Sequence, residues 1–157
     1  ESIGNLTALD NLTLGYCTWL TSLPESIGNL STLTRLDITY CQSLTLLPET
    51  IGNLTALSTF ILDGCNCLIS LPESIGSLAA LNTLDLSHCK TLTSLPDSVG
   101  NLVALRQIRL RWCVSLTSLA PIRPLAPSLV VVDFEYCTSL MRIDDWGSLL
   151  YGKTSIS

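Results

Sequence analysis

Apolar and polar residues alternate in a short segment that recurs every 24 residues of this 157-residue chain. The segment is Leu36-Asp37-Ile38-Thr39 in one unit, Leu84-Asp85-Leu86-Ser87 in another and Val132-Asp133-Phe134-Glu135 in a third. Alternation with a period of two predicts a short strand with one buried face. Because connections of equal length separate successive strands, the pattern predicts a sheet of six parallel strands.

A second segment, LPESIGNL, lies between successive strands. It starts at Leu23 and recurs as LPETIGNL from Leu47, LPESIGSL from Leu71 and LPDSVGNL from Leu95, while ESIGNL opens the chain at Glu1. Pro24 can occupy the first position of a helical turn, and Glu25 suits its positive end. Gly28 is expected to stop the turn early. The segment therefore predicts a short helical or 3₁₀ turn on the back of each coil, with Ile27 and Leu30 pointing inward.

Six cysteines share the 24-residue spacing, so we expect them to stack in a column with one member from each coil. They are Cys17, Cys41, Cys65, Cys89, Cys113 and Cys137. Parallel side chains in such a column hold their Cβ atoms farther apart than the roughly 3.8 Å that a disulfide prefers. A tetrahedral metal site needs converging ligands, whereas a column presents them in a row. The spacing therefore predicts a structural cysteine ladder of packed thiols without a metal. Cys67 lies outside it, and we expect an exposed thiol there, with a reactive thiol as the alternative.

The unit Leu33-x-x-Leu36-x-Ile38-x-x-Cys41-x-x-Leu44, followed by Leu47-Pro48, resembles the leucine-rich repeat. The resemblance covers residues 1–143. It implies an α/β leucine-rich-repeat solenoid of about six 24-residue repeats, with a parallel β-sheet on the concave face and short helical or 3₁₀ turns on the convex face. In that family the ladder position holds Asn or Cys, turned inward to hydrogen-bond backbone groups of the loop after the strand.

Both ends of the predicted solenoid depart from the repeat. The segment Ala120–Pro127 replaces the turn in the last coil, and its prolines predict an extended connection. Residues 144–157 are expected to form a C-terminal cap and a mobile tail, with apolar residues from Ile143 to Tyr151 covering the last coil. The chain starts inside a repeat without an N-terminal cap, so we expect other domains of the same chain to precede Glu1.

The positions that differ most between repeats lie on the outward side of the strand segments and directly after them. Aromatic residues and arginine are enriched in binding hot spots. We therefore expect a protein or peptide partner to bind the concave strand face through Tyr16, Tyr40, His88, Arg109, Arg111, Trp112 and Tyr136. Two structural roles are the alternatives. The rings could stack on one another, and the arginines could pair with Asp85, Asp133 and Glu135.

Charge and composition exclude several classes of function. The chain has 8 Lys and Arg against 13 Asp and Glu, and a net charge of −5 disfavours nucleic acid as a partner. No apolar run approaches the roughly 18–20 residues of a membrane-spanning helix. His88, the single histidine, adjoins Cys89 but points to the other face of the strand segment, so the two cannot form a catalytic pair. Glycines occur singly and form no phosphate-binding loop. We expect neither enzymatic activity nor a cofactor.

The cysteine ladder, the Leu-Pro that ends each unit and the LPESIGNL phrase resemble the repeats of plant intracellular nucleotide-binding leucine-rich-repeat disease resistance proteins. The resemblance implies a domain that senses a ligand and helps to hold an innate immune receptor of plant defense inactive. Unpaired thiols favour a reducing, cytoplasmic location. The alternatives are a stand-alone intracellular scaffold, the substrate-recruiting domain of a larger protein such as a ubiquitin ligase, and an engineered consensus solenoid. A Gly-x-x-x-x-Gly-Lys-Ser/Thr loop upstream of Glu1 would favour the receptor, and its absence would exclude that function.

Overall fold

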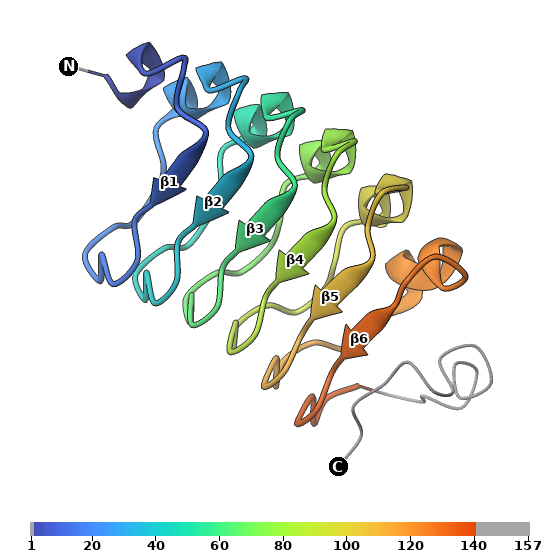
Figure 1. Ribbon diagram of the computed structural model, residues 1–157. Helices are drawn as coiled ribbons and strands as arrows, with labels where there is room; N and C mark the ends of the chain where they lie inside the picture. The colour runs from blue at the N-terminus through green and yellow to red at the C-terminus, as the bar shows by residue number, and fades with distance from the viewer. Residues whose placement is uncertain (1, 141–157) are drawn as a thin grey trace.

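The computed structural model describes residues 2–140, which form six coils that each contain one short strand and one 3₁₀ turn. The strands are β1 (Asn11–Thr13), β2 (Arg35–Asp37), β3 (Thr59–Ile61), β4 (Thr83–Asp85), β5 (Gln107–Arg109) and β6 (Val131–Asp133). They form one parallel sheet in chain order, and each residue pairs with the residue 24 positions later (Figure 1). The predicted sheet of six parallel strands is confirmed.

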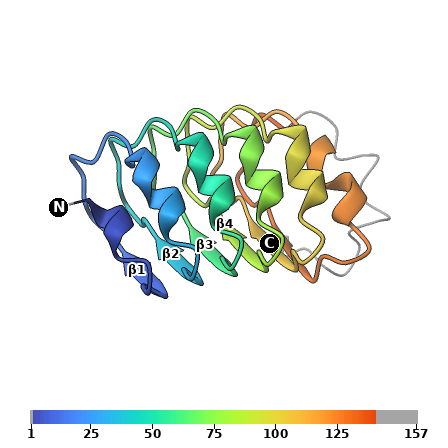
Figure 2. The same ribbon diagram turned by 90° about the horizontal axis from the view of Figure 1, so that it is seen from above.

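The 3₁₀ turns lie on the side of each coil opposite the strand. They are η1 (Ile3–Asn5), η2 (Glu25–Asn29), η3 (Glu49–Asn53), η4 (Glu73–Ser77), η5 (Asp97–Asn101) and η6 (Ala120–Leu125). Viewed from above, the strands run along one side of the molecule and the turns along the other (Figure 2). The solenoid therefore has two distinct surfaces, a strand face and a turn face.

The core fills the space between these two faces. The middle residue of each strand from β2 to β6 is fully buried, as are the apolar residues that follow the first four of these strands. Ile27 and Leu30 of the turn side are also fully buried, as predicted. In the first coil the corresponding strand residues, Leu12 and Leu14, are only partly buried.

In the four turns η2 to η5, proline lies one position earlier relative to the turn than the sequence predicts. Pro24 is the N-cap residue of η2, with extended backbone angles, and Glu25 is the first residue of the turn. The Pro24 carbonyl accepts the Ile27 N–H at 3.0 Å, and the Ile27 carbonyl accepts the Leu30 N–H at 3.1 Å. An N-cap needs no N–H of its own, so proline is tolerated there. Glu25 keeps its predicted place at the positive end of the turn.

The glycine of the turn does not stop it, in contrast to the prediction, because Gly28 lies within η2 and the turn continues to Asn29. Its role is to let neighbouring coils approach closely. A Cβ on Gly28 would lie 2.6 Å from the Thr50 carbonyl oxygen, and a Cβ on Gly52 would lie 2.5 Å from that of Ser74. Real Cβ atoms essentially never make contacts this short with backbone. Glycine is therefore required by the spacing between coils.

The predicted extended connection in the last coil is wrong, because residues 120–125 form the 3₁₀ turn η6. A short 3₁₀ turn needs few amide donors. Two hydrogen bonds at its ends come from Ile122, which donates to the Leu119 carbonyl at 3.0 Å, and from Ala126, which donates to the Arg123 carbonyl at 3.2 Å. The prolines make neither bond, and their fixed φ near −65° suits a 3₁₀ conformation.

Five of the six ladder cysteines, Cys41, Cys65, Cys89, Cys113 and Cys137, form a column of thiols that bond to the preceding coil. Each of these Sγ atoms donates to a backbone carbonyl 27 residues earlier. The distances are 3.2 Å from Cys41 to Leu14 and 3.3 Å from Cys65 to Ile38. Cys17, in the first coil, is exposed, and Cys67 is exposed as expected. No disulfide forms between the described cysteines, and residues 2–140 contain no group of His, Cys, Asp and Glu side chains placed to hold a metal ion.

The expected C-terminal cap and mobile tail of residues 144–157 lie outside the described residues, as does Glu1. The part of the chain that the structure describes contains no helix long and apolar enough to cross a membrane.

We predict that Gly52→Ala destabilises the fold by about 1–3 kcal/mol, because its Cβ would meet the Ser74 backbone. Gly15→Ala is the matched control, since its Cβ would have its nearest neighbour, the Thr39 carbonyl oxygen, at an ordinary 3.6 Å. Urea denaturation followed by circular dichroism measures both. Equal stability of the two variants would contradict the role assigned to the turn glycines.

We also predict that the ladder makes stability depend on alkaline pH. Burial raises the pKa of Cys65 from 9.0 to about 12. The unfolded thiol therefore ionises first, and stability that is complete below about pH 9 is lost as the pH rises towards 12. Urea midpoints at several values of pH should show a shallower decline in Cys65→Ala than in the wild type. The exposed-thiol control Cys67→Ser should keep the wild-type slope, and an unchanged slope in Cys65→Ala would refute the prediction.

Candidate protein-binding face

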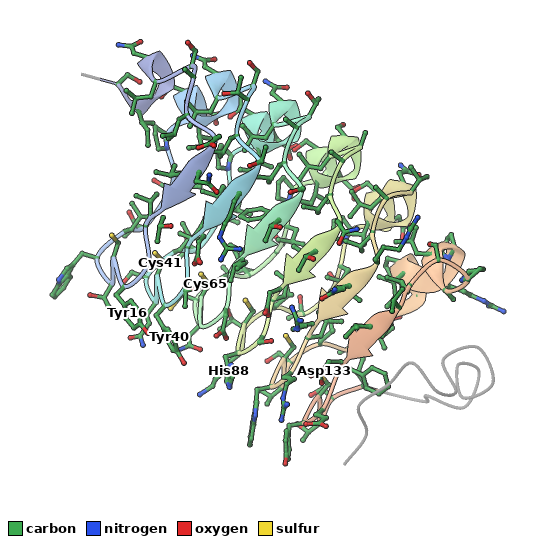
Figure 3. All side chains as sticks on the ribbon, in the orientation of Figure 1. Tyr16, Tyr40, Cys41, Cys65, His88 and Asp133 are labelled. Carbon is green, nitrogen blue, oxygen red and sulfur yellow. The ribbon has the colours of Figure 1, made fainter. Side chains whose placement is uncertain are left out.

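The predicted aromatic residues lie in the turns that follow the strands, and Figure 3 shows Tyr16, Tyr40 and His88 along one edge of the sheet. We call this set the aromatic row, and its members are Tyr16, Tyr40, His88, Trp112 and Tyr136. Each follows the last residue of its strand by three positions, so the common register of the strands also aligns the row. In the third coil Gly64 occupies the equivalent position.

Every member of the aromatic row has a left-handed backbone conformation, with φ between 57° and 62°. At this point the chain leaves the strand and turns, and the amide of Tyr40 still donates to the Asp63 carbonyl of the next coil at 2.7 Å. Left-handed geometry costs a residue with a Cβ about 1–2 kcal/mol. Gly64, with φ of 75°, adopts it without that cost. The presence of glycine at this position was the one signal in the sequence that could have predicted the conformation.

Stacking between rings partly offsets this cost. Tyr16 and Tyr40 stack with their centroids 5.2 Å apart, Trp112 and Tyr136 at 4.2 Å, and His88 and Trp112 at 6.3 Å. Such pairs contribute about 0.5–1.5 kcal/mol beyond the area that they bury. The stacking expected as a structural role is therefore present. It leaves much of the rings open, since Tyr16 is 72% exposed, Tyr136 49% and Trp112 39%.

The arginines of the strand face are balanced by neighbouring carboxylates. Arg109 lies 3.8 Å from Asp85 and also donates to the Gln107 side chain at 3.1 Å. Arg111 bridges two acids of the next coil, reaching Asp133 at 3.7 Å and forming an ion pair with Glu135. The arginines are thus paired with acids, as the structural alternative expects. Asp133, however, pairs with Arg111 and not with Arg109. Both guanidinium groups remain partly exposed on the strand face.

The acid at the end of several strands has a backbone role that the sequence analysis missed. Asp37 accepts the Thr39 N–H at 3.1 Å and the Thr39 hydroxyl at 2.6 Å, and it pairs with Arg35 at 3.0 Å. Burial alone would raise the pKa of Asp37, but these hydrogen bonds and the Arg35 charge outweigh it and lower that pKa. Asp85 caps the Ser87 N–H in the same way at 3.0 Å. The sequence signal for this role was an Asp placed two residues before the backbone N–H that it accepts.

His88 faces the strand side and not the cysteine ladder. Its Nδ1 lies 2.9 Å from Asp63 Oδ1 in the preceding coil. The Cys89 thiol instead donates to the Leu62 carbonyl at 3.4 Å, within the core. His88 and Cys89 are therefore separated, as predicted from the alternation of adjacent residues. His88 therefore lies in the aromatic row, beside the Asp63 carboxylate.

Comparison with known proteins agrees with this architecture. The family model of the leucine-rich repeat matches residues 32–54 and 80–102. The leucine-rich-repeat domain of the type III effector XopL superimposes with a TM-score of 0.60 at 20% sequence identity, covering 96% of this chain and 68% of that one. The fold is a leucine-rich-repeat solenoid. Domains of this kind are generally protein-interaction modules without enzymatic activity.

Two other solved structures superimpose with lower TM-scores. A leucine-rich-repeat protein of Leptospira interrogans has 24% identity and a TM-score of 0.48. The Arabidopsis receptor kinase HAESA, solved with the peptide hormone IDA and the co-receptor SERK1, has 27% identity and a TM-score of 0.46. The matches cover 97% and 68% of this chain, but the chain spans only 51% of the Leptospira protein and 22% of HAESA. No curated protein matches the sequence.

The leucine-rich-repeat solenoid therefore brings all seven predicted site residues to one face, in two arrangements. The rings form the aromatic row along the edge beyond the strands, and the arginines lie within the strand face beside it. Arg106, near the two site arginines in sequence, donates to the Val103 and Leu105 carbonyls and so serves its own loop. What the face binds stays a prediction.

Proposed function

We propose that this domain binds a protein or peptide through the strand face, with the aromatic row as the principal contact and Arg109 and Arg111 beside it. The observation that carries the proposal is the row itself. Five ring-bearing residues occupy a backbone conformation that glycine adopts at lower cost, and three of them, Tyr16, Trp112 and Tyr136, are exposed to solvent. Aromatic side chains at such positions favour a binding role, because aromatic residues are enriched in hot spots.

We further propose that the domain is the ligand-sensing and autoinhibitory repeat domain of a cytoplasmic immune receptor. The supporting observations are the resemblance of the repeat phrase to plant disease resistance proteins and the free thiols, which suit a reducing compartment. The competing roles are a stand-alone scaffold and the substrate-recruiting domain of a larger protein such as a ubiquitin ligase. A phosphate-binding loop found upstream of Glu1 would favour the receptor over both competing roles.

Binding through this face predicts that Trp112→Ala weakens the affinity for a partner by roughly 30-fold or more, because a central aromatic hot spot contributes about 2 kcal/mol or more. A suitable partner is a ligand selected against the folded domain from a displayed peptide library, with its Kd measured by calorimetry. Arg111→Glu should also weaken binding, since it reverses a charge beside Asp133 and Glu135.

The matched control is Val103→Ala, which truncates a 71% exposed apolar residue in the connection between η5 and β5, before the strand. It should leave Kd unchanged. If Val103→Ala weakened binding while Trp112→Ala and Arg111→Glu did not, the binding face would be wrongly assigned. Circular dichroism of each variant confirms that the fold is intact.

A further inference from the structure

The aromatic row is interrupted in the third coil, where Gly64 takes the place of a ring. The stacked rings form two blocks on either side of it. One block is Tyr16 with Tyr40, and the other is His88 with Trp112 and Tyr136. Within residues 2–140 no ring contact joins Tyr40 to His88, and both side chains point to the same edge of the molecule (Figure 3). The break lies between two aromatic surfaces.

The dimensions of the break suit one planar group. Tyr40 and His88 are two coils apart, which separates their backbones by roughly 10 Å at about 4.8 Å per strand. A planar group in van der Waals contact with a ring on each side needs roughly 7–8 Å between the ring planes. Tyr40 leans towards the break, since a Cβ on Gly64 would lie 2.5 Å from its Cδ1 atom. Gly64 itself contributes no side chain.

A carboxylate whose basic partner is a histidine and not an arginine lies at the same coil. The other acids of the strand face pair with arginine. These pairs are Asp37 with Arg35, Asp85 with Arg109, and Asp133 and Glu135 with Arg111. Asp63, directly before Gly64, lies 2.9 Å from the His88 imidazole, and no Lys or Arg among the described residues forms an ion pair with it. The break in the aromatic row therefore coincides with the one of these carboxylates that contacts a histidine and no arginine.

Building on the proposed binding face, we propose that the break is a binding site for an arginine side chain of the protein partner. The guanidinium lies between the rings of Tyr40 and His88 and donates hydrogen bonds to the Asp63 carboxylate. A guanidinium is planar, stacks on aromatic faces and matches a carboxylate with paired N–H donors. A lysine ammonium satisfies the charge but not the stacking. With the guanidinium in place, planar groups run without interruption from Tyr16 to Tyr136.

The test is a titration of the full 157-residue chain with the peptide N-acetyl-Gly-Arg-Gly-amide, followed by NMR. The expected result is binding in the millimolar range, as for a single side chain, with shifts centred on the Gly64 amide and the His88 ring. The matching lysine peptide should bind at least about fivefold more weakly, because it lacks the planar stacking group. The citrulline peptide keeps the planar group but has no charge, and it should also bind more weakly.

Two variants separate the charge from the break. Asp63→Ser introduces the residue that Ser87 already provides one coil later, so the fold should tolerate it, and it should weaken arginine binding at least about fivefold. Gly64→Tyr fills the break with a side chain whose Cβ displaces the Tyr40 ring, leaves Asp63 in place and should abolish binding. Glu73→Gln, which removes a charge from the turn face, is the control and should bind like the wild type.

Equal affinity for the arginine and lysine peptides, or unchanged binding in Asp63→Ser, would overturn the arginine site. So would shifts centred on Glu25, Glu49 and Glu73 of the turn face, which would indicate general attraction to acids. Failure of the peptide to bind at Gly64 would overturn it as well. None of these results bears on whether Trp112→Ala weakens the selected partner, so failure of the arginine site and failure of the proposed function are distinguishable.

Discussion

Close contact between the turns of neighbouring coils is the constraint on which the rest of this structure depends. Gly28 packs against the backbone at Thr50, Gly52 against Ser74 and Gly76 against Ser98, in each case with no room for a Cβ. The same translation sets the strand register on the other face and the thiol-to-carbonyl bonds of the cysteine ladder between them. Three sets of contacts therefore require the same distance between coils. A change of length within one coil would disturb all three.

This constraint explains why the turn face repeats one phrase while the strand edge varies. A residue on the turn face is limited by the next coil, whereas a side chain beyond the end of a strand meets solvent on its outer side. The variable edge is therefore where binding chemistry can be placed without disturbing the stacking. The aromatic row shows the cost of using it, because its backbone is left-handed and the stacking of neighbouring rings offsets part of that cost.

Features set by periodicity could be predicted from the sequence, and features set by local backbone geometry could not. The 24-residue spacing was enough for the parallel strands, the buried Ile27 and Leu30 and the inward-facing ladder. It said nothing of φ, so the left-handed conformation of Tyr40 and its neighbours was missed although Gly64 stands in the same column. Local preference also misled at η6, because a turn of six residues tolerates prolines that a longer helix would not.

Deletion of one coil tests the shared register most directly. Removing residues 66–89 takes out 24 residues and leaves every column in phase, whereas removing residues 67–89 takes out 23 and shifts all later coils by one position. Urea unfolding should show a single cooperative transition for the 24-residue deletion, with an m-value reduced in proportion to the lost surface. The 23-residue deletion should lose cooperativity and most of its stability. Equal transitions for the two proteins would contradict the account, because coil stacking would then not depend on the common 24-residue register.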